Sequence, residues 1–564
     1  MSIIHINQIK NKVNELFQDK LDLSDIGSTD IHKEDKITTR CLAAYAVYIS
    51  VECSLEEAAN SVVDGGDDNG VDAIFYSAIN KRVIVVQSKF SKDGSGEPES
   101  AGVGKFCTGL RDLFNLNFDR FNSKISTKQH EIEKALSEYD TKYSLIFIDT
   151  HVANELAIHS TRLIDGLLTE MNNVGDENAD KIVSFDRLNQ SKVHSSLALS
   201  AGNDPIELEL GLTNWGTIAD PYKAYYGMVA GKEIYDWWKN YNMRLFDKNI
   251  RQVLGKTEVN DEIRKTLNES PELFWYFNNG ITLIADKIGK SIVGGGSRDI
   301  GSFKLTKVAI VNGAQTVSSI GKFGDIEGAE KLDNVKVNIR IIQISDTPEN
   351  FDKEVTRTNN RQNRIENRDF VSQDPEQIRI RTELLIDNVD YNIMRSESFR
   401  ITENSFDLSE ATVALACASG KTSLAVQAKG GIGKFFENLE KGIYKELFNR
   451  SISGYYVFNS VKVVRKIDGI LSDKIKNLIK KSGRDYGMLI HGNRIISLIA
   501  IKKLSLKPEL GKVEFNVDDY DLNKIVDDTI LLIKTKLDSS YPDNILGTLF
   551  KNGSKCNEIV NSII

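Results

Sequence analysis

Residues 54–90, SLEEAANSVVDGGDDNGVDAIFYSAINKRVIVVQSKF, constrain the fold of this chain more than any other stretch. Two short apolar runs, VDAIFY and RVIVVQ, flank the connection SAINK. Apolar runs of this length, rich in β-branched and aromatic residues, are typical of buried strands. The sequence therefore predicts a β-hairpin. Antiparallel pairing would bring Asp72, the second residue of the first run, to the same end of the sheet as Gln87 and Lys89.

These three side chains have the chemistry that metal-dependent phosphodiester cleavage needs. A hard divalent ion takes oxygen ligands, which the Asp72 carboxylate and the Gln87 side-chain carbonyl can supply. Lys89 lies two residues beyond Gln87 and shares its strand face, so its charge can stabilise the transition state. We therefore predict Asp72 and Gln87 as ligands of Mg²⁺ or Mn²⁺, with Lys89 as a further catalytic residue. The alternative is that Asp72 caps a turn and Lys89 is a solvated strand end.

A short helix is predicted just before the hairpin. Ser54 with Glu57 three residues later matches a capping box, which accounts for Glu57 structurally. Glu56 borders the apolar side of this helix and is our candidate for an additional catalytic carboxylate. Asp67 or Asp68 in the acidic turn could take that place.

The size and composition of the chain set wider limits. A chain of 564 residues is too long for one ordinary domain, and two to four are expected. The net charge of -8 gives no global basic character, so nucleic-acid binding would need a local patch. Five scattered cysteines without a C-x-x-C pair argue against a zinc site or a disulfide framework. With no apolar run long enough to span a bilayer, we expect a soluble, cytoplasmic protein and no membrane partner.

The order of apolar segments predicts three regions. A helical segment and the buried strand KYSLIFID follow the hairpin, which gives a compact α/β domain over residues 1–165. After a linker near residue 200, residues 205–420 alternate strands and helices, which predicts a second α/β or α+β domain. Its strands are expected in LFWYFNNGITLIAD, FKLTKVAIVNGAQTVSSI and NVKVNIRIIQI. Residues 421–564 are expected to be mainly helical.

Asp72, fourteen intervening residues and then Gln87-Ser88-Lys89 resemble the PD-(D/E)xK nuclease core, in the variant of Mrr-like restriction endonucleases where Gln replaces the acidic residue. The resemblance covers roughly residues 40–150. It implies a restriction-endonuclease-like fold in which Asp72, Gln87 and Lys89 are the core active-site residues.

A second constellation lies in residues 356–370, TRTNNRQNRIENRDF. Its arginines are spaced by four, three and four residues, which would place them on one face of a helix. Such a row could follow a phosphate backbone while neighbouring amides contact bases or sugars. The alternative is a solvated face paired with local carboxylates. The predicted nucleic-acid-binding residues are Arg357, Arg361, Asn363, Arg364 and Arg368.

This segment and three others resemble the AIPR family of abortive-infection phage-resistance proteins. The other phrases are RLFDKNIRQVLGKTEVN, PELFWYFNNGITLI and VNGAQTVSSI, and all four occur in family order over roughly residues 210–400. The resemblance implies a bacterial antiphage defence protein, often with an N-terminal nuclease-like region. Asn278-Asn279-Gly280 and Asn312-Gly313, within these phrases, are predicted to form tight turns.

Together these patterns favour an antiphage effector whose metal-dependent nuclease cleaves DNA, with RNA as an open alternative. The competing hypothesis is a nucleic-acid-binding or infection-sensing protein whose nuclease core is inert. A homodimer is compatible with either hypothesis.

Overall fold

The computed structural model describes residues 3–51, 53–78, 81–137, 141–175, 181–201, 205–246, 258–291, 298–348, 351–362, 371–394 and 399–564. The chain forms two compact units. Unit 1 joins Met1–Ser191 to Ile365–Ile564, and unit 2 is Lys192–Arg364. The sequence pattern predicted three successive regions with boundaries near residues 165, 205 and 420. The units defined by packing differ, because unit 1 combines the first and last parts of the chain.

The N-terminal part of unit 1 is built on a four-stranded sheet in the order β1-β2-β3-β4. β1 and β2 form the predicted antiparallel hairpin, and β3 and β4 continue the sheet in parallel. The elements of this part are α1 (Ile3–Phe17), α2 (Lys33–Ser50), α3 (Leu55–Asn60), β1 (Ala73–Ser77), β2 (Arg82–Lys89), α4 (Ser100–Phe114), α5 (Ser123–Thr127), α6 (Gln129–Ser137), β3 (Lys142–Asp149), α7 (Ile158–Met171) and β4 (Val183–Leu188). The helix α8 (Gln190–Ala201) follows and belongs mostly to unit 2.

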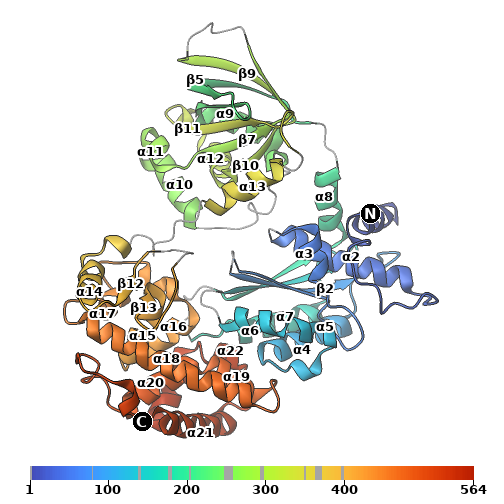
Figure 1. Cartoon of the computed structure of the whole chain (residues 1–564). Helices are drawn as coiled ribbons and strands as arrows, with labels where there is room; N and C mark the ends of the chain where they lie inside the picture. Colours follow the sequence, from blue (N-terminus) through green and yellow to red (C-terminus); the bar gives the residue numbers. More distant parts are fainter. Residues whose placement is uncertain are drawn as a thin grey trace. The chain divides into compact units, whose positions relative to one another are not determined.

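Helices cover both faces of this sheet, with α2 and α3 on one side and α4 to α7 on the other (Figure 1). β2 and β3 are therefore buried along almost their whole length, which explains their near-continuous apolar sequences. Val83 and Val85 of β2 pack with Val103 and Phe106 of α4 in one core. Parallel strands connected through helices also place the carboxyl ends of β2, β3 and β4 at one edge of the sheet.

The C-terminal part of unit 1 is largely helical, as predicted. Its elements are α14 (Pro375–Leu385), β12 (Asp390–Asn392), β13 (Ser405–Asp407), α15 (Leu408–Ala418), α16 (Thr422–Gly430), α17 (Ile443–Leu447), α18 (Gly454–Asn477), α19 (Arg484–His491), α20 (Asn493–Lys503), α21 (Leu522–Ser540), α22 (Leu546–Leu549) and α23 (Gly553–Ile563). It docks on the N-terminal part: the Thr548 hydroxyl donates to the carbonyl of Met171, and the Gly483 N–H to that of Leu116.

Unit 2 contains a seven-stranded mixed sheet in the order β10-β7-β11-β6-β5-β9-β8. Apolar residues of α9, α10 and α12 pack on one face in a single core, while α13 packs on the β7 and β10 end of the opposite face. The elements are β5 (Leu208–Ile218), β6 (Ala224–Ala230), α9 (Gly231–Tyr241), α10 (Glu258–Glu269), α11 (Phe274–Phe277), β7 (Ile281–Ala285), β8 (Lys287–Lys290), β9 (Ile300–Thr306), β10 (Ala309–Asn312), α12 (Ala314–Glu327), β11 (Lys336–Gln343) and α13 (Phe351–Gln362).

One predicted strand needs correction. In LFWYFNNGITLIAD only the second half is extended, as β7, because the segment 274–277 turns as the short helix α11. The predicted turn after it is confirmed: Gly280 has a φ of 81° and its N–H donates to the side chain of Asn278. A Cβ on Gly280 would lie 2.4 Å from the carbonyl oxygen of Asn338. Glycine is therefore required here both by the positive φ and by the lack of space for a side chain. Among the described residues, no helix combines the length and the apolar character needed to cross a membrane.

Candidate metal centre

Asp72 lies where β1 begins and β2 ends. The hairpin register runs as far as the pair Ala73 and Val86, and the Asp72 N–H just before it donates to the Val86 carbonyl at 2.8 Å. The carboxylate is buried and accepts the backbone N–H of Ser88 at 2.7 Å. The Ser88 hydroxyl is 3.0 Å from the same carboxylate oxygen and 2.9 Å from the carbonyl of Thr39 on α2. Backbone pairing and Ser88 thus fix the position of the Asp72 side chain.

Two further carboxylates approach Asp72. One oxygen from each of Asp64, Asp68 and Asp72 lies within 4.8 Å of the others. Asp64 is brought there by backbone pairing, since its N–H donates to the Asp72 carbonyl. Asp68 lies in the acidic turn, where its carboxylate accepts the Gly70 N–H at 2.8 Å. Three carboxylate oxygens at this spacing match the ligands that a hard divalent cation prefers.

Basic side chains hold two of these carboxylates from outside the cluster. Arg40 of α2 is buried and donates from Nε to Asp64 at 2.8 Å, while its two terminal nitrogens contact Asp25. Lys105 of α4 donates to Asp68 at 2.7 Å. Asp64 and Asp68 are therefore oriented by ion pairs on opposite sides of the sheet, because α2 and α4 cover different faces.

The electrostatics of the cluster centre on Asp72. Burial and the neighbouring charge of Asp64 raise the pKa of Asp72 to about 7, against an opposing effect of Lys89. A carboxyl group in this situation prefers to be neutral unless a cation stabilises its charge. The raised pKa therefore fits a site where a divalent ion can replace a proton.

Gln87 supplies the most informative atoms of the site. Its side chain is fully buried, and within the described part of the chain neither its amide nitrogen nor its carbonyl oxygen has a hydrogen-bond partner. Such a group carries an uncompensated desolvation cost, typically about 1–3 kcal/mol. Gln87 directly precedes Ser88, whose backbone N–H binds the Asp72 carboxylate, and a metal ion bound here would satisfy the Gln87 carbonyl oxygen.

Lys89 completes the predicted set from the half-buried end of β2. Its Cε lies 3.3 Å from the position that a Cβ would take on Gly102 of α4, so the glycine leaves room for the lysine side chain. Asp72 thus lies where β1 begins, and Gln87 and Lys89 lie where β2 ends, at the same edge of the sheet.

The sequence pattern also predicted an additional catalytic carboxylate, Glu56, with Asp67 or Asp68 as alternatives. The capping box of Ser54 and Glu57 is present as predicted. Glu56 is exposed on α3 and is not among the carboxylates within 4.8 Å of one another, and neither is Asp67. Asp68, the stated alternative, is in that group. The sequence pattern did not single out Asp64, for which the acidic run D-G-G-D-D was the available signal.

A second polar group at the same edge was also missed. Asp149 ends β3 as the register partner of Lys89 and is fully buried. It accepts two hydrogen bonds from Arg187 of β4, at 2.7 and 3.0 Å, and lies 3.2 Å from Nδ1 of His151. The pattern of the strand KYSLIFID predicted burial but not this ion pair, because Arg187 is distant in sequence.

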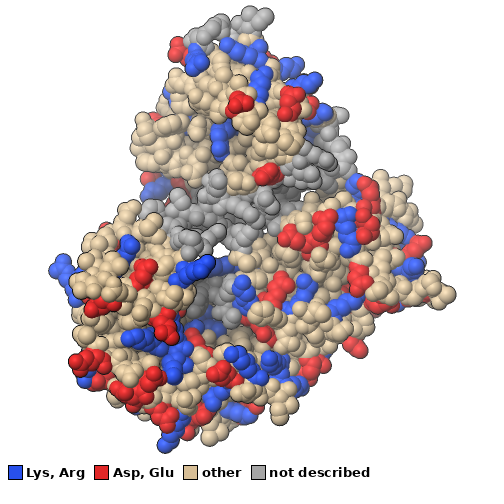
Figure 2. All heavy atoms as spheres, in the orientation of Figure 1, with Lys and Arg blue, Asp and Glu red and all other residues tan. Residues whose placement is uncertain are grey.

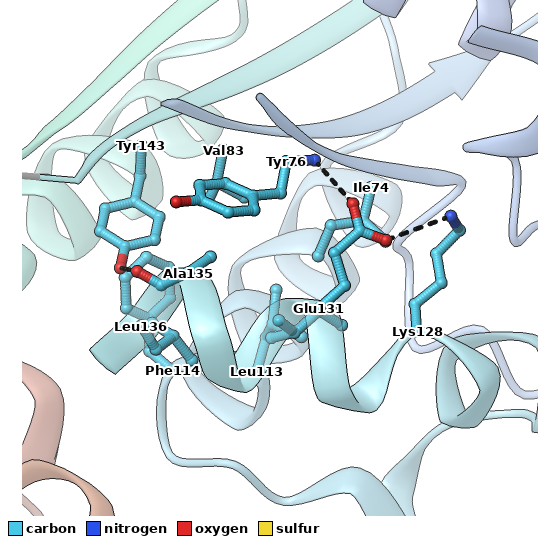
Figure 3. A pocket seen from close by; sticks show the side chains of 11 residues that line it. Ile74, Tyr76, Val83, Leu113, Phe114, Lys128, Glu131, Ala135, Leu136 and Tyr143 are labelled. Carbon is cyan, nitrogen blue, oxygen red and sulfur yellow. Dashed lines mark hydrogen bonds and ion pairs between the residues drawn. The ribbon is translucent and has the colours of Figure 1, made fainter. Parts of the chain in front are cut away.

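A pocket of about 350 Å³, including solvent-open space, lies toward the other end of the hairpin (Figure 3). Glu131 accepts the N–H of Tyr76 at 3.3 Å and is 3.7 Å from Nζ of Lys128. The rest of the lining is mainly apolar, so the pocket offers no ligand set comparable with the acidic cluster. It is lined by Ile74, Tyr76, Val83, Leu113, Phe114, Lys128, Glu131, Ile132, Ala135, Leu136 and Tyr143.

The predicted arginine row stays a prediction. Arg357 and Arg361 belong to the helix α13, but their side chains are not described. Asn363, Arg364 and Arg368 lie outside the described residues.

Comparison with known proteins bears on the later part of the chain. A family model described as AIPR protein matches residues 246–529, just over half of the 564 residues. The chain belongs to the AIPR family. Membership suggests an abortive-infection phage-resistance protein. The AIPR match extends well beyond the phrases that predicted it, through most of the C-terminal helices. It does not include the acidic cluster, and the searches of curated proteins and of solved structures gave no match.

Proposed function

We propose that this AIPR protein is a bacterial antiphage effector that hydrolyses phosphodiester bonds of nucleic acid at the edge of its N-terminal sheet. The observation that carries the proposal is the buried, unpartnered amide of Gln87, next in the strand to Ser88, whose N–H binds the carboxylate of Asp72. A buried amide without partners beside a carboxylate of raised pKa is costly for folding alone, whereas both groups suit a bound cation.

The residues at this edge fit a hard divalent ion. Asp72 and Gln87 would hold Mg²⁺ or Mn²⁺, and Asp64 and Asp68 add carboxylate oxygens on the same side. When bound, the ion neutralises charge on the phosphate and lowers the pKa of a water molecule. Lys89 would place a positive charge next to the reacting phosphate, where preorganised electrostatics have their largest effect. Ser88 keeps the Asp72 carboxylate in place through its backbone N–H.

The test is a cleavage assay on single- and double-stranded DNA and RNA with Mg²⁺ or Mn²⁺. Lys89→Ala and Asp72→Asn are each expected to lower the rate by about 10²- to 10³-fold, as for removal of one transition-state contact. Lys92→Ala is the matched control, since Lys92 is close in sequence but exposed and paired with Asp35. Circular dichroism verifies that each variant is folded.

Two results would contradict the proposal. Full activity of Lys89→Ala would show that Lys89 is not a catalytic residue and that the active site lies elsewhere. Absence of divalent-ion-dependent cleavage on every substrate, with a folded protein that still binds nucleic acid, would favour the non-catalytic alternative.

A further inference from the structure

The outer face of the unit 2 sheet is partly open. α13 covers its β7 and β10 end. In β6 and β11, next to that helix, alternate side chains point outward and are partly or fully exposed. Tyr226 of β6 is the cross-strand neighbour of Arg340 of β11, and Met228 is the neighbour of Asn338. The Tyr226 ring lies across β5, where a Cβ on Gly216 would be 2.3 Å from it, and the residue is 47% exposed. An aromatic ring therefore lies on an open sheet face beside a guanidinium group.

The open side of these two strands carries no acidic residue. Elsewhere, basic and acidic side chains are interspersed over the face drawn in Figure 2. A surface with cations, an amide and an aromatic ring but no carboxylate is complementary to phosphates and bases. The residues on this side are Ala224, Tyr226, Met228, Ala230, Lys336, Asn338, Arg340 and Ile342.

An aromatic turn adjoins this face at the start of β11. α11 contacts β11, and the loop after α11 places Gly280 against Asn338. Within this turn Trp275, Tyr276 and Phe277 are 42%, 72% and 69% exposed. Three consecutive exposed aromatic side chains are costly in water unless they bind something.

Arg340 connects the open strands to α13. Its Nη2 donates to the side chain of Asn359 on α13 at 2.6 Å and to the Thr282 hydroxyl at 3.1 Å. These bonds fix the guanidinium group on the outer face. Arg340 thus joins the open strands to α13, and the aromatic turn adjoins the same sheet at the start of β11.

We propose that this surface, made by Tyr226, Trp275, Tyr276, Phe277, Lys336, Asn338 and Arg340, binds single-stranded nucleic acid. Exposed rings stack on unpaired bases, whereas a double helix hides the base faces within its own stack. Arg340 and Lys336 contact phosphates, and Asn338 contacts sugar or base edges. The surface lies in unit 2 and the acidic cluster in unit 1, so binding here does not depend on nuclease chemistry.

Tryptophan fluorescence offers a direct test. Trp237 and Trp238 are buried, and Trp215 is half-buried against Phe303, so Trp275 is the exposed tryptophan of the chain. Full-length protein carrying Asp72→Asn, kept in EDTA to prevent cleavage, is titrated with a single-stranded oligonucleotide and with the duplex of the same sequence. We expect quenching by the single strand, a tighter Kd for it than for the duplex, and loss of the quenching signal in Trp275→Phe.

Fluorescence anisotropy of a labelled oligonucleotide measures the contribution of each group. Replacing Tyr276 and Phe277 by serine is expected to weaken single-strand binding by about 5- to 150-fold for each ring that stacks. Arg340→Gln is expected to weaken it and to flatten its salt dependence. Ile326→Ser on α12 is the matched control, because Ile326 is 64% exposed on a helix that packs on the opposite sheet face.

Several outcomes would overturn the proposal. These are an absence of single-strand binding, equal binding of duplex and single strand, and full binding by the serine variant. Binding of a protein partner alone through the aromatic turn would overturn it equally. Because cleavage is blocked throughout, failure of the proposed nuclease activity would leave these binding results intact.

Discussion

The carboxylate of Asp72 accepts the backbone N–H of Ser88, the residue that separates Gln87 from Lys89, at 2.7 Å. This bond ties the start of β1 to the end of β2. The Ser88 hydroxyl reaches the same carboxylate and the Thr39 carbonyl, so α2 is tied to the same point. The backbone of Ser88 thus fixes the Asp72 carboxylate at the strand end that carries Gln87 and Lys89.

Asp72→Asn is expected to stabilise the metal-free protein at high pH. The folded-state pKa of about 7 exceeds the ordinary value of 3.8, so the folded protein binds the proton more tightly than the unfolded chain. Stability from this group is therefore fully present below about pH 4 and is lost as the pH rises through 7. In EDTA at pH 8 the asparagine variant should melt a few degrees higher than wild type, with a smaller difference at pH 5. A larger stabilisation at pH 5 than at pH 8 would contradict the assigned environment.

Gln87→Leu is expected to separate stability from ion binding. Leucine removes the unpartnered buried amide and should stabilise the metal-free protein by about 1–3 kcal/mol. It also removes a metal ligand, so the rise in Tm that Mn²⁺ produces in wild type should shrink. Gln87→Glu is the matched comparison and should retain or enlarge that rise. Melting curves with and without Mn²⁺ measure both effects, and an unchanged Mn²⁺ response in the leucine variant would remove Gln87 from the ligand set.

Arg40→Met is expected to destabilise the fold and loosen the acidic cluster. It leaves Asp64 and Asp25 without their guanidinium partner, which should cost about 3 kcal/mol, near the low end for a broken buried pair because Asp25 is 39% exposed. Lys36→Met on the same helix is the control, since its pair with Asp30 is exposed and should contribute less than about 1 kcal/mol. Urea denaturation measures both, and equal losses in the two variants would show that burial of Arg40 does not matter.

Asp149→Asn is expected to destabilise the protein, because it removes the buried negative charge that accepts two hydrogen bonds from Arg187. The expected loss is about 3–5 kcal/mol, measured by urea denaturation. Glu170→Gln is a suitable control, because it breaks the half-exposed pair with Arg111 and should cost about 1 kcal/mol or less. A loss for Asp149→Asn no larger than that of the control would argue that the β3 and β4 ends are held by packing alone.

Much of the N-terminal site could be predicted from sequence because it is local. Asp72 and Lys89 are joined by one hairpin, and the strand patterns specify which side chains share an edge. Asp64 and Asp149 could not be assigned in the same way. Asp64 joins the cluster only because its segment pairs with Asp72, and Asp149 is placed by a parallel strand that follows a long crossover.

The aromatic turn shows a different limit of sequence patterns. Trp275 lies in an apolar run that predicts a buried strand, yet the chain turns there and exposes the ring. Asn278 and Gly280 correctly indicated the turn that follows. Periodicity in a short apolar run does not distinguish a strand from a helical turn, and burial is decided by what packs against it.

The sequence by itself indicated the hairpin and its candidate site residues, the helical C-terminal part and membership of the AIPR family. Only the tertiary structure decided that Asp64 and Asp68 converge on Asp72, that the Gln87 amide is left without a partner, and that the last two hundred residues fold into one unit with the first. The physical reason is range: strand alternation and turn chemistry act over a few residues, whereas buried charge and the pairing of distant strands depend on how the whole chain packs.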